Sequence, residues 1–275
     1  MKKLKRSARL VEMTQYLLSR PHTLISLTAF ADRYQSAKSS ISEDLAIIKE
    51  VFEGEGLGEL HTLAGAAGGV RYIPKTDKQA ALSTIQDICK QLEQPERVLA
   101  GGYLYMTDMI GQPSVMSDVG RIFATAFANR DIDVIMTVET KGIPLAYSTA
   151  TFLNLPVVIV RRDNKVTEGS AVSINYVSGS NKRIQTMSLA RRALKEQSRV
   201  LIIDDFMKAG GTVQGMIDLL TEFNATVAGV GVFVESGEVE IEERLLEDYV
   251  SLAKLTAVDM KTKHTTVVPG NYFYE

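Results

Sequence analysis

The chain has 275 residues, 45% of them hydrophobic and 23% charged, with a formal net charge of −2 at pH 7. This composition is ordinary for a soluble globular protein of one large or two smaller domains. No apolar run approaches the roughly 20 residues of a membrane-spanning helix, which excludes a membrane protein. The single cysteine, Cys89, excludes an internal disulfide and favours a cytoplasmic location, and the three histidines lie too far apart to predict a metal site.

The charge is unevenly distributed along the chain. Residues 1–50 contain nine Lys or Arg residues against five Asp or Glu residues, a net charge of +4, which leaves −6 for the remainder. A basic end of this kind indicates contact with a polyanion. A solvated helical face would carry the same charges, so charge alone does not distinguish a polyanion-binding surface from such a face.

Three helices and two short strands are predicted for the first 74 residues. Apolar residues recur at helical spacing in each helix, as in the series Ile41, Leu45, Ile48 and Phe52. Glycines end the last helix, and a glycine-rich loop then joins two runs of strand residues. The predicted elements are a helix in residues 7–20 with Ser7 as its cap, a helix in residues 26–34 with Ser26 as its cap, a helix that begins at Ser36, and strands in residues 59–63 and 70–74.

This order of elements is typical of a winged helix-turn-helix domain, which we predict for residues 1–74. In that motif the last helix enters the major groove of DNA by its N-terminal end, where lysine and short hydroxyl side chains suit phosphates and base edges. Two alternatives stay open: Ser36, Ser39 or Ser40 can simply cap the helix, and similar small helical modules also bind proteins. The candidate DNA contacts are Lys5, Arg6, Arg9, Lys38, Ser39, Ser40, Ser42 and Arg71.

Residues 75–275 are predicted to form a second domain of the α/β class. A helix in residues 76–93, with Cys89 in its apolar stripe, connects it to the first domain. From residue 114 on, helical segments alternate with β-branched runs, which predicts a mostly parallel sheet covered by helices. In such sheets ligands bind beyond the carboxyl ends of the strands. The predicted strands are residues 134–138, 156–160, 199–203 and 226–234.

The segment "RVLIIDDFMKAGGTVQG", residues 199–215, places two acidic residues beside a loop suited to an anion. The loop Met207–Thr212 follows a strand and opens a helix, so its glycines, its free N–H groups and Lys208 favour a phosphate. Asp204 and Asp205 end the strand, and carboxylates accept hydrogen bonds from the vicinal hydroxyls of a ribose. Together these features predict a site for a ribose 5-phosphate. The alternative is a strand-to-helix turn with incidental acids, and the absence of GxxxxGK[ST] excludes a Walker A loop.

The stretch "VLIIDDFMKAGGT" resembles the phosphoribosyl pyrophosphate (PRPP) motif of type I phosphoribosyltransferases, a likeness that covers about residues 95–275. The stretch "VETKGIPLA", residues 138–146, is similar to that family's pyrophosphate loop, and Arg161 matches a basic residue that contacts pyrophosphate. Residues 163–183 correspond to the family's mobile loop. The resemblance implies that PRPP, accompanied by Mg²⁺, is an effector. The candidate effector contacts are Tyr103, Thr140, Lys141, Gly142, Arg161, Asp204, Asp205, Phe206, Met207, Lys208, Ala209, Gly210, Gly211 and Thr212.

With the N-terminal module included, the chain resembles the purine operon repressors of Gram-positive bacteria, in which a winged-helix domain is fused to a phosphoribosyltransferase-like domain. The stretches "GGYLYMTDMIG" and "NYVSGSNKRIQTMSLARRAL" take part in this match. The resemblance implies a homodimeric transcriptional repressor of purine biosynthesis genes that PRPP releases from operator DNA. The chain departs from many of the enzymes at Lys208 and Ala209, where they have threonines, and no general base for a nucleobase is identifiable.

Two other functions stay open from the sequence. An active purine phosphoribosyltransferase would explain the motif but would leave residues 1–74 without a role. A metabolic sensor whose N-terminal module only dimerises would not bind DNA. Guanosine tetraphosphate or another purine nucleotide is a further candidate ligand that would compete with PRPP, with Tyr103 or Phe206 stacked on its base.

Overall fold

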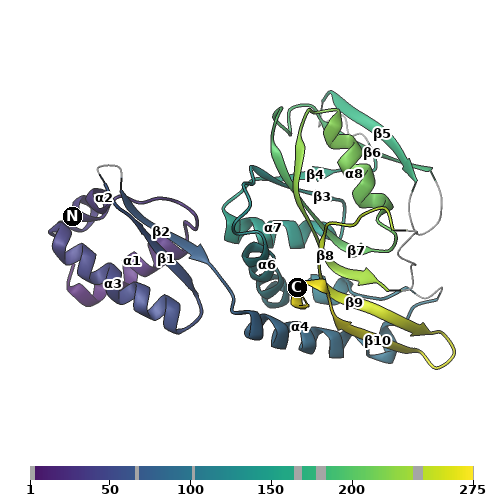
Figure 1. Cartoon of the computed structure of the whole chain (residues 1–275), viewed down its shortest axis with the longest axis horizontal. Coiled ribbons are helices and arrows are strands. Elements are labelled where there is room, and N and C mark those ends of the chain that lie inside the picture. The colour runs from purple at the N-terminus through teal and green to yellow at the C-terminus, as the bar shows by residue number, and fades with distance from the viewer. Residues whose placement is uncertain are drawn as a thin grey trace. The chain divides into compact units, whose positions relative to one another are not determined.

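The computed structural model describes residues 4–65, 68–100, 103–163, 169–177, 184–237 and 244–274. The chain forms two compact units, the first made mainly of Met1–Asp77 and the second mainly of Lys78–Ala150 and Leu155–Glu275 (Figure 1). Each unit has its own hydrophobic core. No helix within the described ranges is long and apolar enough to span a membrane.

The first unit contains three helices and a hairpin, which is the predicted order of elements (Figure 1). One apolar face of each helix and the inner face of the hairpin form its core, which includes the predicted series from Ile41 to Phe52. The elements are α1 Arg6–Leu18, α2 Leu27–Tyr34, α3 Lys38–Gly54 and the antiparallel strands β1 Gly58–Leu63 and β2 Gly69–Pro74.

Two helix starts differ from the prediction. The helix α1 begins at Arg6, so Ser7 lies inside it and does not cap it. The helix α3 begins at Lys38 with Ala37 at the N-cap position, so neither Ser36 nor Ser39 caps it. The prediction for α2 is confirmed, because Oγ of Ser26 accepts a hydrogen bond of 3.0 Å from the backbone N–H of Ala29.

The second unit begins with α4, Lys78–Leu92, which packs its apolar stripe against β9, Val250–Asp259, and β10, His264–Pro269. Cys89 lies buried in this stripe. Burial raises the pKa of its thiol to about 12, so the thiol stays protonated at neutral pH. The residue therefore belongs to the core.

The core of the second unit is a six-stranded sheet in the order β10-β9-β8-β7-β3-β4. Every neighbouring pair is parallel except β9 and β10, which confirms the predicted mostly parallel sheet. Four strands lie outside the prediction because their apolar residues come singly or in pairs and not in a continuous run: β9, β10 and the separate antiparallel ribbon of β5 and β6. The remaining bounds are β3 Val134–Val138, β4 Val157–Val160, β5 Ala171–Val177, β6 Ile184–Ala190, β7 Arg199–Met207 and β8 Thr226–Ser236.

Helices cover both faces of this sheet (Figure 1). On one face, Phe123 of α6 lies against Gly231 of β8, and α7 packs on α6. On the other face, α8 lies between the sheet and the β5–β6 ribbon, where Gly215 allows close contact with Tyr176. The helices are α5 Thr107–Ile110, α6 Pro113–Ala126, α7 Gly142–Leu153 and α8 Gly211–Thr221, with short 3-10 helices at Pro95–Arg97 and Asn271–Phe273.

The direction of the strand order reverses between β3 and β7. The chain leaves β3 through α7 toward β4 on one side, and it leaves β7 through α8 toward β8 on the other. The two strands are direct parallel neighbours, with Val134 paired to Val200 and Met136 to Ile202. The loops after them therefore open side by side at the carboxyl edge of the sheet, where doubly wound sheets bind ligands.

Candidate functional site

A cleft of about 1250 Å³ opens at this reversal point. Its lining comes from the ends of β3 and β7, from the loop that leads into α8, from the segment before α5, and from the region of β9. The structure therefore brings together two stretches that the sequence singled out separately. Among the candidate effector contacts, those that line the cleft are Tyr103, Thr140, Lys141, Asp204, Asp205, Phe206, Lys208 and Thr212.

Two adjacent carboxyl groups lie at the end of β7. Asp204 is only 3% exposed and Asp205 is half-buried, and Oδ1 of Asp204 accepts a hydrogen bond of 3.1 Å from the backbone N–H of Asp205. Burial raises the pKa of both carboxyls, the Asp205 charge raises that of Asp204 further, and Lys141 opposes the rise at Asp205. The pair is costly to ionise in the free protein, and in its ionised form it is a strong acceptor for the hydroxyl groups of a ligand.

Glycine shapes the loop after the two acids. Gly210 has φ +90°, in the left-handed region, and stands at the N-cap of α8. This backbone conformation favours glycine, and the side chain of Leu246 packs over it, with Cδ1 at 2.7 Å from where a Cβ would lie. Lys208 and Thr212 line the cleft beside the helix start, where the first N–H groups lack intrahelical partners. This part of the cleft can hold a phosphate.

Met207 does not face the cleft as an effector contact would. Its side chain is 3% exposed and belongs to the hydrophobic core. The neighbouring Ala209, Gly210 and Gly211 lie outside the cleft lining too, and the carbonyl of Ala209 accepts a hydrogen bond of 3.0 Å from the backbone N–H of Leu245.

The loop after β3 supplies a second polar wall. Thr140 and Lys141 line the cleft, and the Glu139–Thr140 peptide bond is cis. Gly142 opens α7, where a Cβ would collide with Oγ1 of the fully buried Thr137. Glycine thus lets this loop lie close to its own strand, and the positive charge of Lys141 opposes the rise that burial causes in the pKa of Asp205.

Arg162, and not the predicted Arg161, lines the cleft. Nη1 of Arg161 donates a hydrogen bond of 3.1 Å to Oε2 of Glu139, and the Arg161 backbone bridges to Ser188 of β6. The backbone N–H of Arg162 donates to Oε1 of Glu139 at 2.8 Å, which holds this residue against the loop after β3. Arg162 is therefore the arginine of this pair that faces the cleft, and the contact between Arg161 and pyrophosphate stays a prediction.

An apolar and aromatic wall completes the cleft. Tyr103 and Tyr105 precede α5 and are 55% and 40% exposed. Leu255 and Val258 of β9 line the cleft as well, together with Met260. This surface suits the flat face of a base or sugar. Apart from Tyr103, the residues of this wall were not predicted from the sequence, because segments so distant in the chain meet only in the folded sheet.

The predicted mobile loop, residues 163–183, contains a β-strand in the part that the structure describes. Residues 171–177 form β5, which pairs with β6 from Ala171–Ala190 to Val177–Ile184. Residues 164–168 and 178–183, including Lys182 and Arg183, lie outside the described residues. Part of this span is therefore an ordered ribbon over α8.

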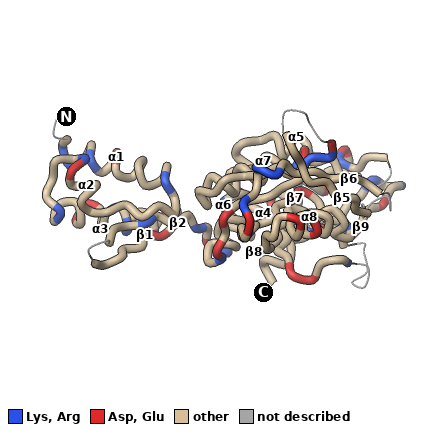
Figure 2. Tube along the Cα trace, turned by 90° about the horizontal axis from the view of Figure 1, so that it is seen from above, with Lys and Arg blue, Asp and Glu red and all other residues tan. Residues whose placement is uncertain are grey.

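In the first unit, the start of α3 presents polar side chains to solvent. Lys38, Ser39 and Ser42 are exposed and Ser40 is half-buried. The hydroxyl of Ser42 donates a hydrogen bond of 3.0 Å to the carbonyl of Lys38, while Ser39 makes no cap bond. Figure 2 shows further Lys and Arg positions at the start of α1. This arrangement can contact phosphates and base edges.

Arg9 does not lie on this exposed surface, which corrects its prediction as a DNA contact. It is 7% exposed, and its Nε donates to Oδ2 of the fully buried Asp44 at 2.6 Å. Its Nη1 donates to Oγ of Ser36 at 2.9 Å, which occupies the hydroxyl expected to cap α3. Arg9 therefore ties α1 to the first turns of α3.

The other basic candidates remain accessible to different degrees. Lys5 is exposed just before α1, and the Arg6 side chain is 54% exposed although it also donates to Oδ1 of Asp44 at 2.9 Å. Arg71 lies half-buried on β2 opposite His61. These positions fit contacts to the phosphate backbone better than contacts to bases.

Comparison with known proteins assigns both units to families. Residues 5–74 match the N-terminal domain of bacterial purine repressors, and residues 106–267 match the phosphoribosyl transferase domain. The chain is 62% identical to the purine biosynthesis transcriptional repressor of Bacillus subtilis over 98% of this chain and 94% of that protein. It is 44% identical to the purine biosynthesis transcriptional activator of Lactococcus lactis subsp. lactis over 98% of this chain and 99% of that protein.

A solved structure shares the fold of the second unit. The adenine phosphoribosyltransferase of Thermoanaerobacter pseudethanolicus superposes on 61% of this chain and 98% of that chain with a TM-score of 0.53 and 20% sequence identity. At this level of identity the likeness shows the fold alone.

Proposed function

This chain belongs to the bacterial purine repressor family, and we propose that it represses purine biosynthesis genes by binding operator DNA, from which PRPP releases it. In this proposal the winged-helix unit, residues 1–74, binds the operator. The phosphoribosyltransferase-like unit, residues 75–275, binds PRPP. The protein acts in the cytoplasm.

One combination of features carries this proposal. The acid pair and the anion loop meet at the reversal point of a phosphoribosyltransferase-like sheet, in a chain that also contains a winged-helix unit. An enzyme needs only the first of these parts, and a DNA-binding protein that senses no metabolite needs only the second. A repressor controlled by PRPP needs both.

The cleft offers a partner for each chemical group of PRPP. Asp204 and Asp205 accept hydrogen bonds from the ribose hydroxyls, and the loop with Lys208 and Thr212 holds the 5-phosphate. Pyrophosphate is assigned to the loop of Thr140, Lys141 and Gly142, with Arg162 in the place predicted for Arg161. Mg²⁺ accompanies PRPP and offsets part of its charge.

Release from DNA follows from linkage between the two ligands. If PRPP and operator DNA prefer different conformations of the protein or share surface, each weakens the binding of the other by the same factor. Since PRPP is the entry substrate of purine synthesis, abundant PRPP then permits expression of the pathway.

The direction of regulation rests on the degree of similarity. The repressor of Bacillus subtilis is 62% identical to this chain and the activator of Lactococcus lactis is 44% identical. We therefore propose repression. A reporter gene behind the operator distinguishes the two, because deletion of a repressor raises expression and deletion of an activator lowers it.

The second unit acts as a sensor and not as a transferase in this proposal. Lys208 and Ala209 stand where many of the enzymes have threonines, and the base-facing wall of the described cleft is mainly aromatic and aliphatic. Incubation with PRPP, Mg²⁺ and each purine base tests this assignment. Pyrophosphate released above the rate without protein would instead support residual transferase activity.

A purine nucleotide is a second ligand for the same cleft. Guanosine tetraphosphate carries phosphates for both anion loops, and Tyr103 and Phe206 line the cleft where they can stack on a base. We propose that it competes with PRPP. A titration in which both ligands bind at once, without loss of affinity for either, would reject the shared site.

We also propose a homodimer, because winged-helix and helix-turn-helix repressors commonly bind two half-sites through two-fold symmetry. Light scattering of the purified protein measures this directly. A mass of one chain, 30.2 kDa, at the concentration that binds DNA would contradict it.

The central test is a DNA-shift titration with operator DNA, with and without PRPP and Mg²⁺. We expect a tight complex that PRPP dissociates. An absence of DNA binding would support a sensor whose N-terminal unit only dimerises. A complex that PRPP leaves unchanged would contradict the proposed effector.

A further inference from the structure

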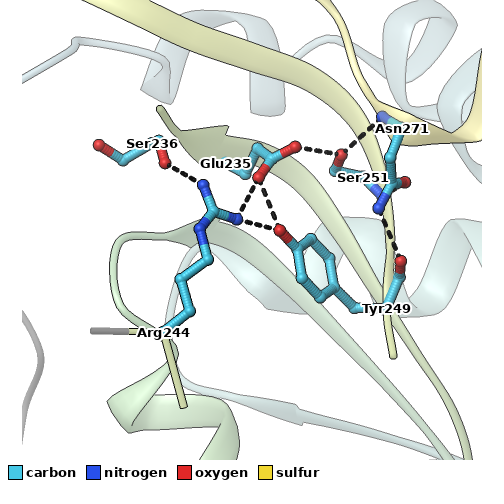
Figure 3. A network of polar contacts seen from close by, with 6 residues as sticks. All are labelled: Glu235, Ser236, Arg244, Tyr249, Ser251 and Asn271. Atoms are coloured by element: carbon cyan, nitrogen blue, oxygen red, sulfur yellow. Dashed lines mark hydrogen bonds and ion pairs between the residues drawn. The ribbon is translucent and has the colours of Figure 1, made fainter. Parts of the chain in front are cut away.

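A buried acid lies behind the cleft and takes no part in the proposed ligand contacts. Glu235 is 3% exposed and stands near the carboxyl end of β8. Its Oε1 accepts a hydrogen bond of 2.8 Å from Ser251, and its Oε2 accepts bonds from Tyr249, at 2.7 Å, and from Arg244 (Figure 3). Burial alone would raise the pKa of Glu235, but these donors hold it below its usual value.

Arg244 is the centre of this network. Besides Glu235, its guanidinium donates to the hydroxyl of Tyr249 and, at 2.8 Å, to the carbonyl of Ser236 (Figure 3). Ser236 lines the cleft. Asn271 extends the network to the end of the chain through Ser251. A planar guanidinium with several acceptors is held in one orientation.

The residues that follow Arg244 touch the loop assigned to the 5-phosphate. The backbone N–H of Leu245 donates to the carbonyl of Ala209 at 3.0 Å. The side chain of Leu246 packs over Gly210, close enough that a Cβ on that glycine would lie 2.7 Å from it. We call Arg244–Leu246 the strap. It connects the anchored guanidinium to the loop by one hydrogen bond and one packing contact.

From this geometry we propose that Arg244 is a positioning residue: anchored on Glu235, it holds the strap against residues 207–212 and so orders the phosphate loop before the ligand arrives. The inference deepens the proposed function and rests on it for the identity of the ligand. A loop that is ordered in advance binds more tightly, because binding then does not have to offset the entropy of ordering it.

An exchange measurement tests the strap without any ligand. Amide hydrogen exchange in residues 207–212 should be faster in Arg244→Ala than in the unaltered protein, because loss of the anchor lets the loop open locally. Arg199→Ala is the matched control: Arg199 also binds an acid, Asp133, with bonds of 3.0 and 2.9 Å, but at the amino end of β7. Unchanged exchange in the Arg244 variant would overturn the proposal.

A PRPP titration by calorimetry supplies the functional readout. We expect Arg244→Ala to lose roughly tenfold or more in affinity, as is typical when the residues behind a binding shell are removed, and Arg199→Ala to keep its affinity. If the affinity falls while exchange in the loop stays unchanged, Arg244 acts by another route and the positioning role fails. If the unaltered protein binds no PRPP, the proposed function fails. The exchange measurement still shows whether the strap orders residues 207–212.

The two leucines of the strap provide a second matched pair. Leu246→Ala removes the packing on Gly210, whereas the side chain of Leu245 is 55% exposed and its alanine variant retains the backbone bond to Ala209. We expect faster exchange and weaker PRPP binding in Leu246→Ala, with little change in Leu245→Ala. Equal effects in both variants would contradict the proposal.

Arg244→Ala leaves a buried charge without one of its donors and can destabilise the whole unit. The double variant Glu235→Gln with Arg244→Met removes the charge together with its partner. It should recover thermal stability while the loop still exchanges quickly and PRPP still binds weakly. Recovery of PRPP affinity together with stability would overturn the positioning role.

Discussion

Asp204 and Asp205 make the free protein sensitive to pH. Burial raises the pKa of both carboxyls in the folded state. Between the ordinary value of about 4 and the raised values, the folded protein holds protons that the unfolded chain has released, so stability falls as pH rises. The contribution of these groups to stability is therefore complete below about pH 4 and lost as the pH passes the folded-state values.

A neutral side chain in place of Asp204 should stabilise the folded protein at neutral pH. Asp204→Asn should raise the free energy of unfolding at pH 7–8 by about 0.5–2 kcal/mol, because a neutral amide costs less to bury than a carboxylate. It should also lose PRPP affinity, because the ribose hydroxyls lose a charged acceptor. Thermal melts at several pH values and a PRPP titration measure both effects. A variant that is less stable and still binds PRPP would refute the assignment.

Ser39 is a candidate for contact with a base, and the structure shows that it does not cap α3. Ala37 stands at the N-cap of α3 and Ser39 is exposed, so Ser39→Ala should leave the melting temperature unchanged. If Ser39 contacts a base edge, the variant should lose about 1–3 kcal/mol of discrimination at one position of the operator. Operator variants titrated against both proteins measure this. A lower melting temperature with unaltered sequence preference would contradict the prediction.

The orientation of α3 depends on a buried ion pair between elements. Arg9 of α1 and Asp44 of α3 are almost fully buried and bonded at 2.6 Å. Arg9→Met leaves a buried carboxylate with Arg6 as its remaining basic partner, and breaking such a pair costs about 3–5 kcal/mol. We expect a large loss of stability in the first unit and, with it, of DNA affinity.

A double variant distinguishes the loss of packing from the effect of an unpaired buried charge. Arg9→Met with Asp44→Leu should restore most of the stability, because replacing both partners by apolar groups is often neutral. Melting curves of the two variants provide the comparison. Equal destabilisation in the single and double variants would show that the buried charge is not the cause.

The junction of β3 and α7 depends on glycine. Gly142→Ala would bring a methyl group against Thr137, which is fully buried and stiff at χ1, and such overpacking costs about 1–3 kcal/mol. We also expect weaker PRPP binding, because the loop of Thr140 and Lys141 must move. Thr137→Ala in the same chain should relieve the collision. If the double variant is no more stable than Gly142→Ala alone, this explanation fails.

Across the whole molecule, the two units have separate cores and separate proposed ligands. A fragment of residues 78–275 should therefore fold and bind PRPP with the affinity of the intact chain. Its operator affinity should fall at least about 10³-fold, the lower end of the usual gap between specific and non-specific binding. Shift assays at one fixed salt concentration measure this. A fragment that binds operator DNA as tightly as the intact chain would refute the DNA assignment.

The sequence by itself determined the features that are local in the chain. The strands β3, β4, β7 and β8 contain continuous apolar runs, and their prediction is confirmed. The acid pair and the loop after it form one uninterrupted motif, because a strand end, a turn and a helix start bind anions with neighbouring residues. The order of three helices and a hairpin was equally readable, since each helix shows its own apolar face.

Only the tertiary structure decided which side chains meet. It placed Arg162 in the cleft instead of Arg161, turned Met207 inward, and buried Arg9 against Asp44. It also assembled the apolar wall from distant segments and packed the strap, Arg244–Leu246, against the loop after β7. These outcomes depend on the direction of a side chain at a strand end and on long-range packing. The local periodicity of the sequence does not predict these side-chain directions, because a shift of one residue reverses the face that a strand residue occupies.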